Sequence, residues 1–331
     1  MPIQVRLDYH LHMRNNLETA IPTKTAPMPR KFIDSSSLLG DPAVLLERAA
    51  SEGYLFFKGL LPAADVLEVR REMLAVVERH GWRQPGMDAL DGRVDVEAIN
   101  RTPDLEVRGD IGVTFKAYED VQRLESFHRL PHHPRLLALY RDLFGGRKVL
   151  AHPRHIARMM TPHSSLVPTP PHQDFPLIQG TSNTWTCWFP VGDCPTELGG
   201  LSVLRGSHRK GYLPIQISDG AGNIAAQLCE GENDWVEGDY TCGDVLTFPS
   251  HTVHKALKPQ VRDSIRLSLD VRFQPADESI EERSLRPHCD LTWEEIYAGW
   301  TNEALQYYWQ KDNLEFSPWN DALMQPSRRI C

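Results

Sequence analysis

The stretch from Ser264 to Phe273 alternates between polar and apolar side chains without a break. Successive side chains of a β-strand point to opposite faces of a sheet, so this pattern predicts a strand with one apolar face. The polar face carries Arg266 and Ser268. That face is either exposed to solvent or turned into a barrel, where a planar guanidinium can bind a carboxylate through two N–H donors.

A His-x-Asp element lies upstream of this strand. In an extended segment, His172 and Asp174 would point to the same side, while Gln173 would face away. Two histidines and one carboxylate on one face of a metal are typical of non-haem Fe(II) oxygenases, because three positions stay open for a co-substrate and O2. A His-x-Asp pair alone is common by chance, so this interpretation depends on a third ligand.

Two histidines compete for the third ligand position. His251 and His254 both lie in the sequence His-Thr-Val-His, after a predicted strand that ends in a turn at residues 243–249. The third ligand of a facial site can come from any part of the fold. His254 is the candidate, and His251 stays open as its competitor.

Together these elements resemble a 2-oxoglutarate-dependent oxygenase, which combines His-x-Asp, a distal histidine and Arg-x-Ser on the following strand. Residues 50–61 and 197–208 are similar to the phytanoyl-CoA dioxygenase family in particular, and the resemblance covers roughly residues 42 to 275. It implies a mainly β fold with flanking helices and a double-stranded β-helix core of the jelly-roll, cupin-like type. It also implies Fe(2+) and 2-oxoglutarate as cofactors, with O2 as co-substrate.

The resemblance assigns roles to individual residues. The family places its distal ligand nearest the arginine-bearing strand, so the expected metal ligands and catalytic residues are His172, Asp174 and His254. The expected 2-oxoglutarate contacts are Arg266, Ser268, Trp188, Lys116 and Gln173. Two of these have an ordinary alternative, since Trp188 would also suit core packing and Lys116 a solvated surface.

The expected reaction is O2-dependent oxidation of a small molecule, coupled to decarboxylation of 2-oxoglutarate to succinate and CO2. Because Asp174 is retained, we expect hydroxylation rather than halogenation, in which a halide takes the position of the carboxylate. Two alternatives are a non-oxygenase, isomerase-like jelly roll with another divalent metal and a catalytically silent binding module. Arg266 and Ser268 argue against the first, and the intact ligand set argues against the second. The sequence does not name the prime substrate.

A basic strand face gives one indication of the substrate. Residues 149–160 are expected to form the first barrel strand, on which Arg154 and Arg158 share a face with His152. If this face lies near the metal, it would attract an anionic substrate. If it lies on an open sheet, it would simply be solvated.

We expect a single oxygenase domain over residues 1–331. Its four parts are an N-terminal arm (1–40), a helical flank with a possible lid (41–147), the jelly-roll core (148–275) and a C-terminal extension (276–331), in which residues 291–309 are predicted to be helical. Two polar segments with little periodicity, residues 83–112 and 215–240, are expected to be loops that cover the barrel mouth.

Composition limits the partners and the compartment. The net charge of −8 gives no basic footprint for nucleic acid, and no apolar run approaches the ~20 residues that cross a bilayer. The six cysteines form no CxxC pair, and in a chain of 331 residues we expect them to be reduced thiols. These features predict a cytoplasmic protein, monomeric or homodimeric, that acts on a small molecule and has no nucleic-acid or membrane partner.

Overall fold

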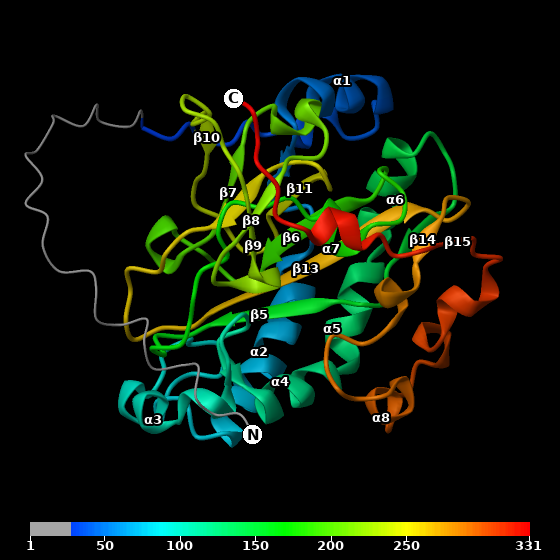
Figure 1. The fold of residues 1–331 in the computed structure, drawn as a ribbon. Coiled ribbons are helices and arrows are strands. Elements are labelled where there is room, and N and C mark those ends of the chain that lie inside the picture. The colour runs from blue at the N-terminus through cyan, green and yellow to red at the C-terminus, as the bar shows by residue number, and fades with distance from the viewer. Residues whose placement is uncertain (1–27) are drawn as a thin grey trace, which may run out of the picture.

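The computed structural model describes residues 28–331, so most of the predicted N-terminal arm lies outside the described residues. Two antiparallel sheets flanked by helices form the core (Figure 1), as expected of a mainly β chain. The larger sheet has the order β1-β11-β6-β13-β4, and β5 also pairs with β13. Its strands are β1 (Leu55–Phe57), β4 (Val149–Ala151), β5 (Ile156–Met160), β6 (Trp185–Pro190), β11 (Val245–Pro249) and β13 (Arg266–Pro275).

The smaller sheet has the order β10-β7-β12. Its strands are β7 (Leu201–Leu204), β10 (Trp235–Val236) and β12 (His254–Ala256), and a separate hairpin comprises β8 (Ile215–Ile217) and β9 (Ile224–Ala226). Side chains from β5, β6 and β13 line one cavity together with side chains from β7 and β12. The two sheets therefore face each other across that cavity.

Strand β13 is buried along its whole length. Its apolar side chains, Leu267, Leu269, Val271 and Phe273, belong to the same core cluster as the buried residues of the flanking helices. On the opposite face, Arg266, Asp270 and Arg272 line the cavity between the sheets. The predicted strand is confirmed, and its polar face is turned inward.

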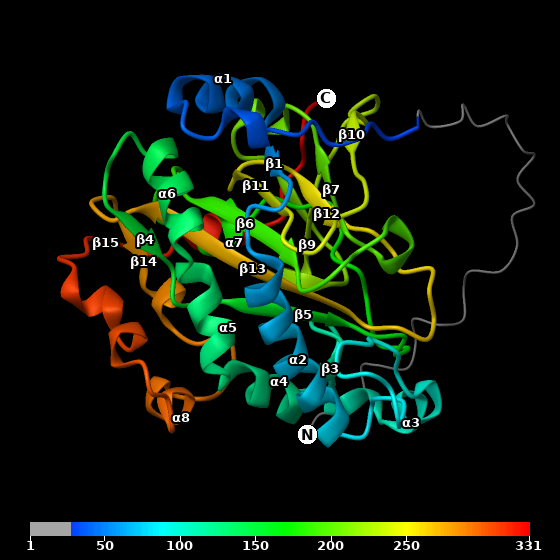
Figure 2. The same ribbon diagram turned by 180° about the vertical axis from the view of Figure 1, so that it is seen from behind.

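Helices cover the outer face of the larger sheet, as Figure 2 shows. Among residues 28–331, no helix is both long enough and apolar enough to cross a membrane. The first helix begins at Pro42, because Asp41 accepts a hydrogen bond from the Val44 N–H (3.3 Å) and proline is favoured at the first helical position. The flanking helices are α1 (Pro42–Glu52), α2 (Ala63–Arg79), α4 (Phe115–Gln122), α5 (Glu125–Arg129) and α6 (Pro134–Leu143).

The strand predicted at residues 149–160 is interrupted. Residues 152–155 separate β4 from β5, although both strands pair with β13. Pro153 lies in the interruption and has no N–H to donate to a neighbouring strand, while its carbonyl accepts a turn hydrogen bond from His155 (2.9 Å). The prediction of one continuous strand over residues 149–160 was therefore wrong for residues 152–155.

The predicted loop at residues 83–112 contains regular structure. It holds α3 (Val96–Arg101) and β2 (Val107–Arg108), which pairs with β3 (Val113–Thr114). The Asp95 side chain caps α3 by accepting a hydrogen bond from the Ala98 N–H (2.9 Å). This capping residue was a local signal for a helix that the low periodicity concealed.

The C-terminal extension is less helical than predicted. Within residues 291–309 the α-helical part is α8 (Trp293–Tyr297), and the chain turns at Gly299, whose φ of +85° lies in the left-handed region that favours glycine. Short 3-10 turns follow. The extension packs its own apolar cluster against Leu150 of the core, and the remaining short elements are α7 (Phe175–Ile178), β14 (Ile280–Glu281) and β15 (Phe316–Ser317).

A disulfide joins Cys229 to Cys331, with the two Cα atoms 5.5 Å apart, so the expectation of six reduced thiols was wrong. The other four cysteines are free thiols. The pairing arises because the C-terminal segment, red in Figure 1, returns across the molecule to the β8–β9 region. Two contacts hold it there: Gln227 donates to the Ser327 carbonyl (2.6 Å), and Arg329 pairs with Glu232 (2.6 Å).

This cross-link can be tested by counting thiols. Denatured under non-reducing conditions, the protein is expected to present four reactive thiols. Cys331→Ser should lower the free energy of unfolding by about 2–4 kcal/mol, because a disulfide restricts the unfolded chain; urea unfolding measures this change. Cys289→Ser, which removes an unbonded thiol, is the matched control and should leave the stability of the cross-linked protein nearly unchanged. Six reactive thiols in the oxidised wild type would contradict the pairing.

Candidate metal centre and its two cavities

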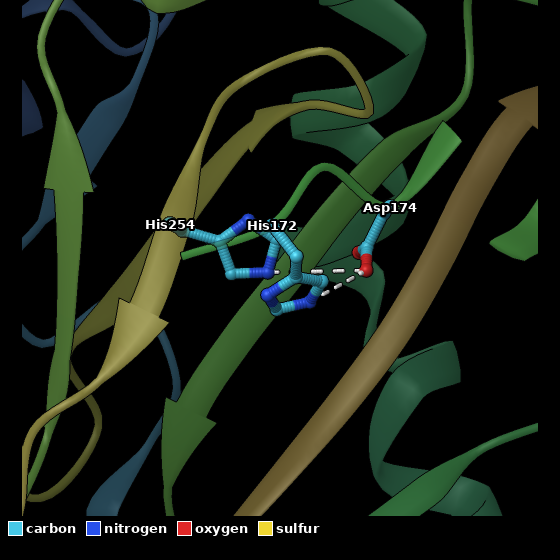
Figure 3. Close-up of side chains that lie close together, drawn as sticks. All are labelled: His172, Asp174 and His254. Atoms are coloured by element: carbon cyan, nitrogen blue, oxygen red, sulfur yellow. Dashed lines mark ion pairs between the residues drawn. The ribbon is translucent and has the colours of Figure 1, made fainter. Parts of the chain in front are cut away.

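Three buried side chains meet between the sheets (Figure 3). His172, Asp174 and His254 each offer one ligand atom, and these atoms lie within 4.8 Å of one another. Asp174 Oδ1 is 3.5 Å from His172 Nε2 and 3.8 Å from His254 Nε2. Two imidazoles and one carboxylate converging on a single point have the donor set of a facial Fe(II) site.

Backbone pairing places the two histidines opposite each other. His172 and His254 form an antiparallel bridge in which each N–H donates to the carbonyl of the other residue (2.9 and 3.0 Å). The sequence suggested an extended segment at Asp174, but this residue has helical φ and ψ angles (−73° and −29°) and directly precedes α7. The carboxylate therefore reaches the histidines from a turn.

The second ring nitrogen of each histidine sets its tautomer. His172 Nδ1 donates to the Pro170 carbonyl (2.9 Å), and His254 Nδ1 donates to the Thr252 carbonyl (3.0 Å). With the proton held on Nδ1, the lone pair of a neutral ring lies on Nε2, the atom that faces Asp174. Burial lowers the pKa of His254 to about 4, so that ring is neutral at pH 7.

Asp174 is held through its second oxygen. Asp174 Oδ2 accepts hydrogen bonds from Arg272 Nη2 (2.9 Å) and from the Thr186 hydroxyl, which leaves Oδ1 directed at the histidines. Burial would raise the pKa of Asp174, but Arg272, His254 and His172 hold it well below its usual range. The protein's own groups thus keep the carboxylate ionised and oriented.

Sequence reasoning missed the role of Arg272. The signal was available, since Arg272 lies on the polar face of the alternating strand together with Arg266. Sequence reasoning also missed the hydrogen bond that the Thr186 hydroxyl donates to Asp174.

A narrow cavity leads from the triad to Arg266. It is lined by Trp188 and Thr186, both on the inward face of β6. Arg266 is 2% exposed and makes no ion pair with any described residue; its Nη1 donates to Ser268 Oγ (2.5 Å), and its buried Nε has no partner. The guanidinium lies 5.7 Å from the centre of the Trp188 ring. A buried cation without an anion is costly, so this cavity suits a carboxylate ligand.

A second, larger cavity of about 290 Å³ adjoins the triad on the other side. His172 and Arg272 line both cavities, and Asp174 lines the larger one. The two arginines predicted to contact the substrate, Arg154 and Arg158, also line the larger cavity. The triad therefore lies where the two cavities meet.

Two of the predicted 2-oxoglutarate contacts, Lys116 and Gln173, lie outside both cavities. Lys116 is exposed in the first turn of α4 and lines neither cavity, because the buried side of that helix carries Ala117 and Tyr118 instead. Gln173 is buried but lines neither cavity. Its amide nitrogen donates to the carbonyls of Gly211 (2.8 Å) and His251 (2.6 Å). Gln173 thus links the segments around these two residues.

The competing histidine lies outside the cluster. His251 stacks on Phe175 with the ring centres 4.4 Å apart, and the cluster of ligand atoms contains His254. The structure therefore brings together the same three residues that the resemblance favoured.

Comparisons with known proteins find related sequences and a shared fold. The 1-deoxypentalenic acid 11-beta-hydroxylase of Streptomyces arenae is 24% identical over 268 residues, which are 77% of this chain and 89% of that protein. The protein of the same name from Streptomyces exfoliatus is 24% identical over 271 residues, with the same coverage. The non-heme alpha ketoglutarate dependent epimerase SnoN from nogalamycin biosynthesis shares the fold, with 22% identity and a TM-score of 0.51 over 72% of this chain and 86% of its own.

A family model decides the classification. The model described as Phytanoyl-CoA dioxygenase (PhyH) matches residues 50–262, a span that includes His172, Asp174 and His254. This match covers more than half of the chain, and the protein belongs to the phytanoyl-CoA dioxygenase family.

Proposed function

We propose that the protein is an Fe(II)- and 2-oxoglutarate-dependent dioxygenase that hydroxylates a small molecule and releases succinate and CO2. The observation that carries this proposal is a pre-oriented His–Asp–His cluster beside a buried arginine, Arg266, that has no anionic partner among the described residues. A silent binding module would not need both features. The hydroxylase relatives from Streptomyces support hydroxylation as the outcome.

In this proposal the facing sheets are the two halves of a double-stranded β-helix within a single domain. The support is the cavity between them, which receives side chains from both sheets. Such a core gives a rigid frame for a metal site, because ligands on paired backbone segments cannot move independently. The bridge between His172 and His254 is an example of this restraint.

His172, Asp174 and His254 would hold the iron, which, when bound, supplies the activation of O2. Arg272 and Thr186 keep the carboxylate of Asp174 in place, and the two Nδ1–H donors keep both imidazoles in the ligating tautomer. Because these outer contacts are already made, iron binding requires little reorganisation of the three side chains.

The distal carboxylate of 2-oxoglutarate would bind Arg266, with Ser268 beside it and Trp188 along one wall. An isomerase-like jelly roll with another metal has no use for a buried, unpaired guanidinium at this position. A dicarboxylate that reaches from the metal to Arg266 would give the guanidinium its missing partner.

Residues 83–112 and 215–240 would help to cover the larger cavity and exclude water. Asp110 of the first segment and Ala221 and Gly222 of the second line its wall. The C-terminal extension adds Arg283 and Trp319 to the same wall, so three separate parts of the chain would enclose the substrate.

The metal assignment predicts a selective effect of histidine removal. Under anaerobic conditions, wild-type protein with Fe(II) and 2-oxoglutarate should develop a weak visible charge-transfer band. His254→Ala should abolish the band, because one imidazole ligand is lost. His251→Ala is the matched control and should retain it. If the two variants exchanged these outcomes, His251 would be the ligand and the assignment would be wrong.

The Arg266 assignment separates 2-oxoglutarate binding from iron binding. Arg266→Gln should weaken 2-oxoglutarate binding by roughly 2–4 kcal/mol, which is about 30- to 1000-fold, since one partner of a buried charge pair is removed. Calorimetric titration of the Fe(II) protein with 2-oxoglutarate measures this effect. Iron affinity without 2-oxoglutarate should stay nearly unchanged. Unaltered 2-oxoglutarate affinity in the variant would place the anchor elsewhere.

A further inference from the structure

The larger cavity has an excess of positive charge on its wall. Four arginines line it, Arg154, Arg158, Arg272 and Arg283, against two aspartates, Asp110 and Asp174. Most of these charges are already compensated, so their partners decide which of them is available to a ligand.

Two of the arginines already form ion pairs with carboxylates. Arg158 Nε is 3.0 Å from Asp270 Oδ2, and its Nη1 is 3.6 Å from Asp110 Oδ2. Arg272 is bound to Asp174 at 2.9 Å. These contacts hold the inner wall of the cavity together and leave neither guanidinium free of an anion.

The third arginine lies at the outer edge. The Arg283 guanidinium stacks on the Trp319 ring at 3.9 Å, and its Nε lies 3.9 Å from Glu281 Oε1. Its side chain is 55% exposed, so water screens its charge. It is a poor candidate for the main anchor of a ligand.

Arg154 differs from the other three. It makes no ion pair with any residue of the described chain 28–331, although it is largely removed from water. Its one hydrogen-bonded nitrogen, Nη1, donates to the backbone carbonyls of Arg286 and Pro287, which fixes the guanidinium and leaves its other two nitrogens unbonded. Burial lowers the pKa of Arg154, and the neighbouring positive charges of Arg108 and Arg272 lower it further.

Much of the remaining wall is apolar or uncharged. His288 accepts a hydrogen bond from the Tyr118 hydroxyl or donates one to it (2.7 Å), and burial holds its pKa well below the usual range, so it carries no charge at pH 7. The apolar part comprises Ile156, Leu177, Ile178, Ala221 and Trp319.

We propose that the prime substrate is a compact, mainly apolar molecule with one carboxylate group, and that Arg154 binds this carboxylate. One uncompensated guanidinium matches one singly charged group, and a cavity of about 290 Å³ suits a small body. This proposal rests on the proposed dioxygenase function. It makes Arg154 the specificity-determining residue, and the oxidised carbon lies toward His172 and Asp174, away from the carboxylate.

The test compares acids with their uncharged amides. The probes are 1-adamantanecarboxylate, decanoate and abietate, each paired with its primary amide, and binding is measured by calorimetry on the metal-free protein and on the anaerobic Fe(II)–2-oxoglutarate form. At least one acid should bind ten-fold or more tightly than its amide. The comparison of acids with amides on the metal-free protein does not depend on iron. If the wild type developed no visible band with Fe(II) and 2-oxoglutarate, the dioxygenase function would be disproved, but the acid preference could still be measured.

Three variants assign the preference to one residue. Arg154→Gln should remove the acid preference and leave amide binding unchanged, while Arg154→Lys, which keeps the charge, should retain most of the preference. Arg286→Gln is the matched control, because Arg286 is exposed, pairs with Glu282 and contacts Arg154 through its backbone. All variants should keep the Fe(II)–2-oxoglutarate band.

Two results would overturn the proposal. In one, no acid binds more tightly to the wild type than its amide does. In the other, the preference survives in Arg154→Gln and disappears in Arg283→Gln, which would assign the carboxylate to the outer arginine.

Discussion

The structure depends on the burial of both faces of β13. Its apolar face packs against the helices, and strict alternation then turns Arg266, Asp270 and Arg272 into the space between the sheets. Buried charges need partners, and two of these three have them: Asp270 pairs with Arg158, and Arg272 pairs with Asp174. The third, Arg266, makes no ion pair with any residue from 28 to 331, and this is the guanidinium that we propose binds the co-substrate. The arrangement of the site thus follows from one strand.

The same charges connect structure to chemistry at the triad. Arg272 stabilises the ionised form of Asp174 and fixes one of its oxygens, so a single ion pair prepares both the charge and the direction of the ligand. Two backbone carbonyls fix the orientation and the tautomer of the histidines by accepting hydrogen bonds from their Nδ1–H groups. Preparation of this kind is what distinguishes a site built for a metal from three polar residues that happen to be close.

Local patterns predicted much of this site. The alternation in β13 could be predicted because it depends on neighbouring residues alone, and the family resemblance selected His254. Contacts between residues far apart in the sequence could not be predicted. The pairing of Asp174 with Arg272 joins residues 98 apart, and the disulfide joins residues 102 apart. The placement of Lys116 also depends on the fold, because a similar position in the sequence did not put it on the buried side of α4.

The alternation in β13 also has a consequence for the unfolded chain. A strand buried on both faces is usually a continuous apolar run, and such a run is prone to intermolecular β-aggregation whenever it is exposed during synthesis or refolding. Here residues 264–273 carry Arg266, Asp270 and Arg272 among the apolar side chains. Charges interspersed in this way act as gatekeepers against strand stacking between molecules. The residues that shape the interior of the native protein therefore also protect the newly made chain from self-association.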